Sequence, residues 1–270
     1  MINIDILKGE IPIGEDFDTG LLRPKEELYR KFWKNGREGP LNPIVARKLM
    51  QIADNITKNL NIDVDPKDII ITGSIASYNW HDLSDIDLHI LYDFEEINED
   101  FELVKKMLNE TRINWNRTHN IKIAGKEVEL YFQHAYEPHE SNGIWSLTLE
   151  KWLSLPVSLN PKLDLKNSSK KAEAVVGNIE FLFDLFKREK FREAYEYAGK
   201  VKSKIARMRK CGLDSEGIYS PENLAFKMLR NSGYLEKLSF LKIEAYDRMM
   251  SLKVESNNIN VSKVWNKFIK

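Results

Sequence analysis

Residues 84–94, SDIDLHILYDF, alternate between apolar and polar side chains and constrain the fold more than any other stretch. Side chains of a strand point alternately to opposite faces, so this pattern predicts a strand with one face in the core. The apolar face would hold Ile86, Leu88 and Ile90, and the polar face would hold Asp85, Asp87 and His89. Two like charges beside a core are costly unless a cation lies between them, so Asp85 and Asp87 need an explanation.

The rest of the chain divides into a mixed half and a helical half. Before residue 135, helical patterns at 43–62 and 100–115 surround two further strand signals, DIIIT at 68–72 and the hairpin IKIAGKEVELYFQH at 121–134. Residues 135–167 are expected to be irregular. From residue 168 onward, apolar residues recur only at helical spacing, with Ser168 or Ser169 and Ser220 as expected helix caps.

These patterns predict an α+β fold with a small mixed β-sheet, helices on one of its faces, and a following helical bundle. The expected domain organisation has five parts: an N-terminal extension at 1–40, the mixed domain at 41–140, a connecting segment at 141–167, a helical domain at 168–254 and a tail at 255–270.

Composition excludes several classes of protein. The 270 residues carry no formal net charge, so no overall field favours nucleic acid or an anionic membrane as a partner. The single cysteine is Cys211, which excludes an internal disulfide and suits a reducing cytoplasm. No apolar stretch approaches the roughly 18 residues of a membrane span. We therefore expect a cytoplasmic protein without a membrane partner.

Two further features point to phosphate chemistry. Gly73 and Ser74 follow the first strand, and a short helix is expected to begin at Ser74, so exposed N–H groups there would favour a phosphate. Mg²⁺ prefers hard oxygen ligands and is commonly held by one or two carboxylates together with phosphate oxygens. Asp85 and Asp87 fit that role, and Glu129, between two apolar residues of a later strand, would be a third acid.

The combination of Gly73-Ser74, ten intervening residues, Asp85-x-Asp87 on a strand and a later strand acid resembles the DNA polymerase β-type nucleotidyltransferase superfamily. The resemblance implies a nucleotidyltransferase core and the transfer of a nucleoside monophosphate from an NTP with release of pyrophosphate. It implies two Mg²⁺ ions, with Mn²⁺ as an alternative. Asp85, Asp87 and Glu129 would be catalytic and would hold the metal, and Gly73, Ser74 and Ser84 would bind the nucleotide.

Longer stretches resemble uncharacterised nucleotidyltransferase-like proteins of large tailed phages. They are TGSIASYNW…SDIDLHIL, GKEVELYFQ, EPHESNGIWSL and SPENLAFKMLRNSGYLEKL. That resemblance places the protein in a host cytoplasm and implies little about its substrate.

Two departures from the superfamily pattern leave alternatives open. The segment IASYNWHDLS, residues 75–84, lacks the usual basic residue and second glycine, and Glu127 shares a strand face with Glu129 and competes with it as the third acid. The basic run at 200–210 would supply the missing charge through Lys200 and Lys204 if its helix faced the nucleotide.

The expected function is thus NTP-dependent transfer to an unidentified hydroxyl, on an RNA 3′ end, a protein or a small molecule. A nucleotide-sensing, antitoxin-like module of the same fold is the main alternative. A metal-dependent glycosyltransferase is a third.

Overall fold

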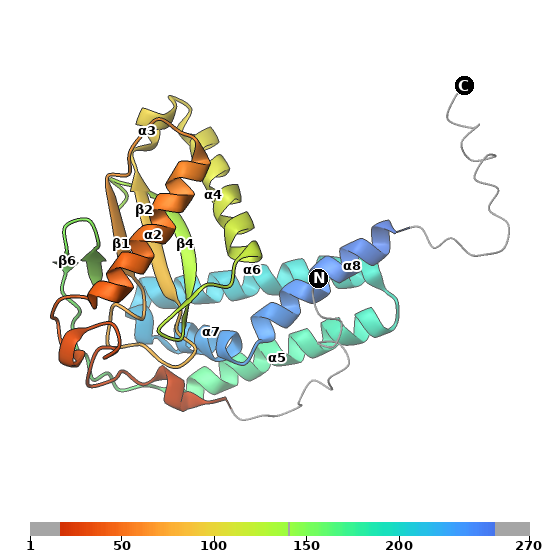
Figure 1. Cartoon of the computed structure of the whole chain (residues 1–270). Helices are drawn as coiled ribbons and strands as arrows, with labels where there is room; N and C mark the ends of the chain where they lie inside the picture. Colours follow the sequence, from red (N-terminus) through yellow and green to blue (C-terminus); the bar gives the residue numbers. More distant parts are fainter. Residues whose placement is uncertain (1–16, 140, 252–270) are drawn as a thin grey trace, which may run out of the picture. The chain divides into compact units, whose positions relative to one another are not determined.

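The computed structural model describes residues 17–139 and 141–251, which form two compact units (Figure 1). The first unit comprises residues 18–162 and contains the whole β-sheet. The described part of the second unit beyond residue 162 is helical. The tail expected at 255–270 and the first sixteen residues of the expected extension lie outside the described residues.

The sheet of the first unit has six strands in the order β3-β4-β2-β1-β5-β6. β2 and β4 are parallel, and the other neighbouring strands are antiparallel. The expected mixed sheet is therefore confirmed. The strands are β1 (Asp68–Thr72), β2 (Ile86–Tyr92), β3 (Lys122–Ile123), β4 (Lys126–His134), β5 (Ile144–Ser146) and β6 (Lys151–Ser154).

One face of this sheet forms the core of the unit. Side chains of α2 (Pro43–Leu60), α3 (Phe94–Ile97) and α4 (Phe101–Thr118) pack with the apolar residues of β1, β2 and β4 in a single buried cluster. Ile86, Leu88 and Ile90 of β2 are completely buried in it, as their alternation predicts. The opposite face of β2 and β4 consequently carries the polar side chains.

The hairpin that joins β3 to β4 has the turn that its sequence predicts. Ala124 and Gly125 both have positive φ angles, 52° and 87°, as a two-residue hairpin turn of the primed type requires. The turn sets the register in which Lys122 pairs with Glu127 and Ile123 with Lys126.

The expectation that residues 135–167 are irregular is wrong for β5 and β6. β5 pairs with β1 and β6 pairs with β5, so this segment extends the sheet at one edge. These strands have three and four residues, too few for alternation to show. Trp145 of β5 and Trp152 of β6 pack on Trp33, with ring centroids 5.4 and 4.3 Å from it.

The described part of the N-terminal segment also belongs to the sheet unit. It contains two short 3₁₀ helices, η1 (Thr19–Leu22) and η2 (Lys34–Gly36). Leu28, Phe32 and Trp33 are completely buried in the main cluster. Burial of three large apolar side chains gives this segment a substantial hydrophobic contribution to the stability of the unit.

The second unit contains α5 (Leu165–Lys187), α6 (Phe191–Glu216), the 3₁₀ helix η3 (Gly217–Tyr219), α7 (Pro221–Asn231) and α8 (Tyr234–Met250). Ser220 caps α7 by accepting a hydrogen bond from the Asn223 N–H, as predicted, and Pro221 is in its first turn. The predicted cap at Ser168 or Ser169 is wrong, because α5 begins earlier and Asp164 accepts from the Asn167 N–H.

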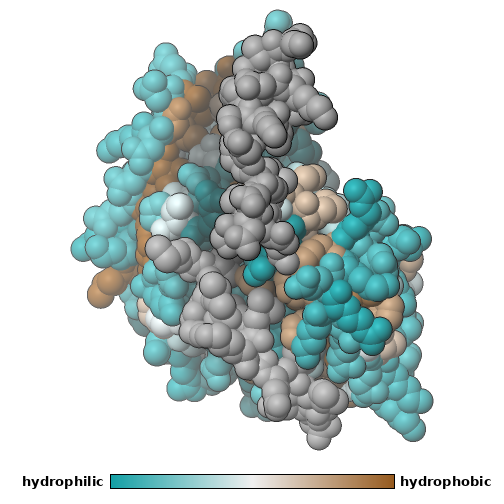
Figure 2. All heavy atoms as spheres, turned by 90° about the vertical axis from the view of Figure 1, so that its right-hand side faces the viewer, coloured by the Kyte–Doolittle hydropathy of each residue, from teal (hydrophilic) through white to brown (hydrophobic). Residues whose placement is uncertain are grey.

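None of the helices in the described residues is long and apolar enough to cross a membrane. On the face that Figure 2 shows, hydrophilic residues cover most of the surface that is not grey, and hydrophobic residues gather in smaller groups.

Candidate metal centre

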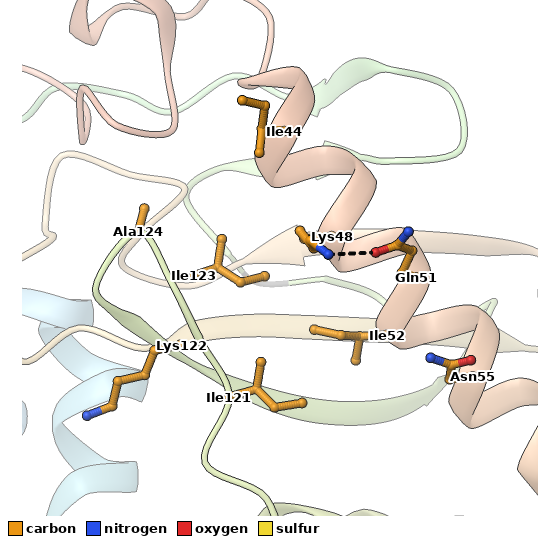
Figure 3. Close-up of a pocket in the computed structure, with 9 residues that line it drawn as sticks. All are labelled: Ile44, Lys48, Gln51, Ile52, Asn55, Ile121, Lys122, Ile123 and Ala124. Carbon is orange, nitrogen blue, oxygen red and sulfur yellow. Dashed lines mark hydrogen bonds between the residues drawn. The ribbon is translucent and has the colours of Figure 1, made fainter.

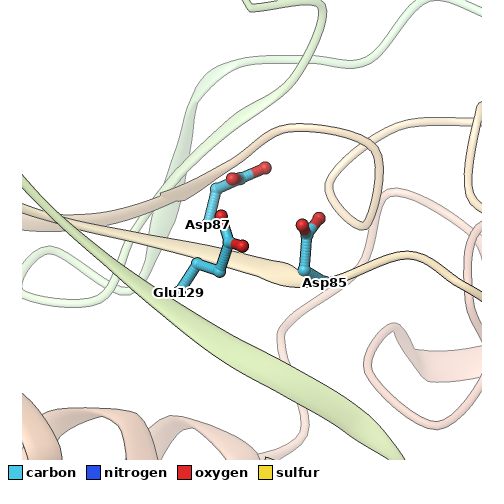
Figure 4. A group of neighbouring side chains, drawn as sticks. All are labelled: Asp85, Asp87 and Glu129. Atoms are coloured by element: carbon cyan, nitrogen blue, oxygen red, sulfur yellow. The ribbon is translucent and has the colours of Figure 1, made fainter. Parts of the chain in front are cut away.

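Three carboxylates converge on the polar face of the sheet (Figure 4). Asp85 immediately precedes β2, Asp87 lies within β2, and Glu129 lies opposite Asp87 in the parallel register of β2 and β4. One carboxylate oxygen from each of the three residues lies within 4.8 Å of the others. The structure therefore brings together the three acids expected to hold a metal.

The donor set of this cluster suits a hard divalent cation. All three side chains are half-buried, so their mutual repulsion is screened less than it would be on an open surface. Mg²⁺ takes oxygen ligands at about 2.0–2.1 Å, so one ion spans oxygens up to about 4.2 Å apart. Asp85, Asp87 and Glu129 could thus hold a divalent metal ion.

Gly73 lies against the Asp87 carboxylate and has a conformation that favours glycine. Its φ angle is 74°, and a Cβ atom at this position would lie 1.7 Å from Asp87 Oδ2. Thr72, the preceding residue, pairs with Asp87 across β1 and β2. The turn after β1 is therefore placed directly beside the acidic cluster.

Ser74 and Ser84 are linked to each other across the segment between this turn and β2. Ser74 Oγ donates to Ser84 Oγ at 2.8 Å, and the His81 N–H donates to the same oxygen at 2.9 Å. Ser84 is buried, so this hydroxyl organises the segment. The helix expected to begin at Ser74 is not formed, because residues 73–79 make turns and a bend. A phosphate at Gly73-Ser74 would depend on individual N–H groups and would lack a helix dipole.

Tyr131 selects between the two candidate third acids. Its hydroxyl donates to Glu129 Oε2 at 2.7 Å, and burial together with that hydrogen bond raises the pKa of Tyr131, so the hydroxyl keeps the proton it donates. Glu127 is exposed, pairs with Lys122 across the hairpin and lies outside the carboxylate group. The geometry therefore favours Glu129 as the third acid.

His89 supports Tyr131 from the neighbouring strand. The two rings stack with centroids 4.7 Å apart, and the His89 nitrogens lie 3.2 Å from Thr72 Oγ1 and 3.0 Å from Gln133 Oε1. Burial lowers the pKa of His89 to about 4, so the ring is neutral at pH 7. His89 therefore holds its neighbours in place and adds no charge to the carboxylate cluster.

We expect Tyr131→Phe to weaken divalent metal binding by about 10–100-fold, as is typical when a partner of a metal ligand is removed. The free energy of unfolding should fall by only about 0.5–1.5 kcal/mol, the usual cost of one hydrogen bond. Metal titration followed by calorimetry measures the first effect. Tyr92→Phe is the matched control, because its hydroxyl bonds Thr57 Oγ1 away from the cluster. Equal metal affinity in the two variants would contradict this role.

Lys126 is a further residue of the site that sequence patterns do not reveal. Its side chain is buried, and Nζ donates to the carbonyl oxygens of His81 and Asp82 at 2.6 and 2.8 Å. It thereby fixes the segment that precedes Asp85. Burial lowers the pKa of Lys126, whereas the nearby carboxylates of Asp82 and Asp85 act in the opposite direction. Lys126 begins β4 and meets this segment only through the tertiary fold, so no local signal marks it.

The remaining expected site residues lie in the other unit. Lys200 and Lys204 are exposed on α6. Their predicted role in nucleotide binding stays a prediction. Tyr78 and Trp145 are buried in the main core, which favours core packing over a role in stacking on a nucleotide base.

A groove lies between α2 and the β3–β4 hairpin (Figure 3). It is lined by isoleucines of both elements and by uncharged and basic side chains, and along α2 Lys48 Nζ donates to Gln51 Oε1 at 3.1 Å. Ile52, Ile121 and Ile123 also pack against the main core. This groove lies at the solvent-exposed edge of the main core, and none of the clustered acids lines it.

Comparison with known proteins gives no match: no protein-family model, no curated protein and no solved structure matches the chain.

Proposed function

We propose that the sheet unit is a Mg²⁺-dependent nucleotidyltransferase, with Mn²⁺ as an alternative ion. The observation that carries the proposal is the convergence of Asp85, Asp87 and Glu129 within 4.8 Å, beside a turn whose Gly73 has room for no side chain. Metal ions held by these three acids would neutralise charge on the triphosphate and on the reacting oxygens. Resemblance to the polymerase β-type superfamily supports the same assignment.

Each acid has a role in this proposal. Asp85 and Asp87 would hold the metal, and the N–H groups of Gly73 and Ser74 would face the phosphates of the NTP. The acceptor oxygen forms a bond to the α-phosphorus, the bond from the α-phosphorus to the bridging oxygen breaks, and pyrophosphate leaves. The acceptor's hydroxyl proton passes to a carboxylate of the cluster, for which Glu129 is best placed because Tyr131 occupies only Oε2.

The acceptor in this proposal is a hydroxyl group of an RNA 3′ end, a protein or a small molecule. Lys200 and Lys204 are proposed to contribute charge to nucleotide binding. The protein would act in the cytoplasm, where NTPs are available.

A nucleotide-sensing module is the second candidate, and one observation favours it. The Ser74 hydroxyl donates a hydrogen bond to Ser84, and no helix begins at Ser74. The turn at Gly73-Ser74 therefore offers a phosphate fewer free hydrogen-bond donors than a turn that opens a helix. Calorimetry with each NTP and Mg²⁺, beside an assay for pyrophosphate release, separates the two. Binding together with release supports the transferase, and binding without release in the presence of cell extract supports the sensor.

A further inference from the structure

Arg112 of α4 carries a positive charge to the margin of the acidic cluster. Its Cζ lies 5.3 Å from the ring centroid of Tyr131. The hydroxyl of that tyrosine donates to Glu129 Oε2 at 2.7 Å, so a single tyrosine side chain links the guanidinium group to the carboxylates. Arg112 and the three clustered acids are all half-buried, so each is partly open to solvent. A substrate that reaches the acids therefore also reaches the neighbourhood of Arg112.

Hydrogen bonds between α4 and β4 fix this position. α4 lies along the edge of β4 that β2 does not occupy (Figure 1). There the Asn116 side chain donates to the Leu130 carbonyl at 3.0 Å and accepts from the Leu130 N–H at 2.8 Å. Arg112 is one turn before Asn116 and shares its helix face. The helix is thus tied to the strand that carries Glu129, and Arg112 is held beside that strand.

The contacts of Arg112 within the protein leave most of its donors unused. Two of its five N–H groups donate to Asn109 Oδ1, from Nε at 3.2 Å and from Nη2 at 2.9 Å. The other three have no partner among the described residues, and neither has the charge a carboxylate there. The helix dipole favours a basic residue in the last turn, which accounts for Arg117. It does not account for Arg112, which lies further from that end.

We propose that Arg112 binds a phosphate group of a substrate held at the acidic cluster. Guanidinium groups match phosphate oxygens in geometry and stay charged at any physiological pH. Arg112 would supply, from another part of the sheet unit, the positive charge that residues 75–84 lack. The phosphate belongs to the NTP or to an RNA 3′ end that serves as acceptor. This inference rests on the proposed function and names a substrate-binding residue for it.

The test is calorimetric titration of the full chain with Mg²⁺ and probes that cannot react. The probes are α,β-methylene-ATP, adenosine and a short single-stranded oligoribonucleotide. The variants are Arg112→Gln, Arg112→Lys, Asp87→Asn and, as a matched control, Arg117→Gln. Arg117 lies on the same helix, is exposed, and donates from Nη2 to Asn114 Oδ1 at 3.0 Å, much as Arg112 does to Asn109. The Mg²⁺ affinity of each variant without nucleotide is measured in parallel.

We expect the wild type to bind the ATP analogue in the presence of Mg²⁺. Arg112→Gln should weaken binding of the analogue, the oligoribonucleotide or both by roughly tenfold or more. Arg112→Lys should weaken it less, because lysine keeps the charge and loses the planar fork. Arg117→Gln should bind both probes as the wild type does. A loss for the analogue alone identifies the NTP as the source of the phosphate, a loss for the oligoribonucleotide alone identifies the acceptor, and a loss for both shows contact with each.

The Mg²⁺ titration separates phosphate binding from a purely structural role. Removing a cation near three carboxylates should leave the Mg²⁺ affinity of Arg112→Gln unchanged or higher. If Arg112 only supported Tyr131, Arg112→Gln would instead weaken Mg²⁺ binding as Tyr131→Phe is expected to do, and that result would overturn the inference. Arg112→Lys carries the test if Arg112→Gln disturbs the fold.

Failure of this inference is distinguishable from failure of the proposed function. Wild-type affinity of both Arg112 variants for both phosphate probes, with binding of the ATP analogue lost in Asp87→Asn, would overturn the role of Arg112 alone. Absence of Mg²⁺-dependent binding of the ATP analogue by the wild type would contradict the proposed function, and this inference with it.

Discussion

Asp87→Asn is expected to abolish metal binding at the acidic cluster and to lower nucleotidyl transfer by more than about 100-fold. Loss of a partner of a metal ligand costs about 10–100-fold, and loss of the ligand itself should cost more. In the wild type, Mg²⁺ at about 100 times its dissociation constant should raise the free energy of unfolding by about 2.7 kcal/mol. The variant should lose that increase. Thermal unfolding with and without Mg²⁺ measures it directly.

The control for this prediction is Asp82→Asn. Asp82 carries an exposed carboxylate three residues before Asp85 and lies outside the cluster. It should keep both the Mg²⁺-dependent stabilisation and the activity. Without metal, Asp87→Asn should unfold within about 1 kcal/mol of the wild type, because it keeps the shape of the side chain and removes one of three like charges. Unchanged Mg²⁺ stabilisation in Asp87→Asn would contradict the metal assignment.

Gly73→Ala should cost about 2–5 kcal/mol of the free energy of unfolding. A side chain at positive φ costs about 1–2 kcal/mol, and forcing an atom into occupied space typically costs a further 1–3 kcal/mol. The occupied space here is that of Asp87 Oδ2, which would lie 1.7 Å from the new Cβ. The displaced carboxylate should also bind metal poorly. Chemical denaturation measures the stability.

Gly125→Ala isolates the backbone part of this cost. Gly125 also has a positive φ, 87°, but no atom lies within 4 Å of a Cβ placed there. It should lose only about 1–2 kcal/mol. The double variant Gly73→Ala/Asp87→Ala should lose about as much free energy of unfolding as Gly125→Ala, because the clashing carboxylate is gone. Equal losses for Gly73→Ala and Gly125→Ala would show that Asp87 does not press on Gly73.

Local patterns were sufficient to predict the strands that carry the acids. β2 and β4 alternate clearly, so the burial of Leu88 and Leu130 and the polar direction of Asp87 and Glu129 follow from the sequence. The sequence alone does not distinguish Glu129 from Glu127 as the third acid, because both share a strand face. It depends on the register between β2 and β4 and on the hydroxyl of Tyr131, which only the folded chain brings together.

The features that sequence reasoning missed arise from tertiary contacts. Lys126 bonds to carbonyl groups 44 and 45 residues away, and no helix or strand period marks such a contact. The turns after Gly73 replace the expected helix because Ser74 and Ser84 tie the segment together across ten residues. β5 and β6 owe their place to pairing with β1 and to tryptophan packing, both non-local.

The proposed metal-dependent nucleotidyl transfer depends on Asp85, Asp87 and Glu129. Its most direct test is release of pyrophosphate from each α-labelled NTP, with Mg²⁺ and cell extract, by the wild type, Glu129→Gln and Glu127→Gln. We predict release and a labelled acceptor for the wild type and Glu127→Gln, and a loss of about 100-fold or more for Glu129→Gln. Transfer by Glu129→Gln at the wild-type rate, or no release by the wild type with any NTP, would contradict the account.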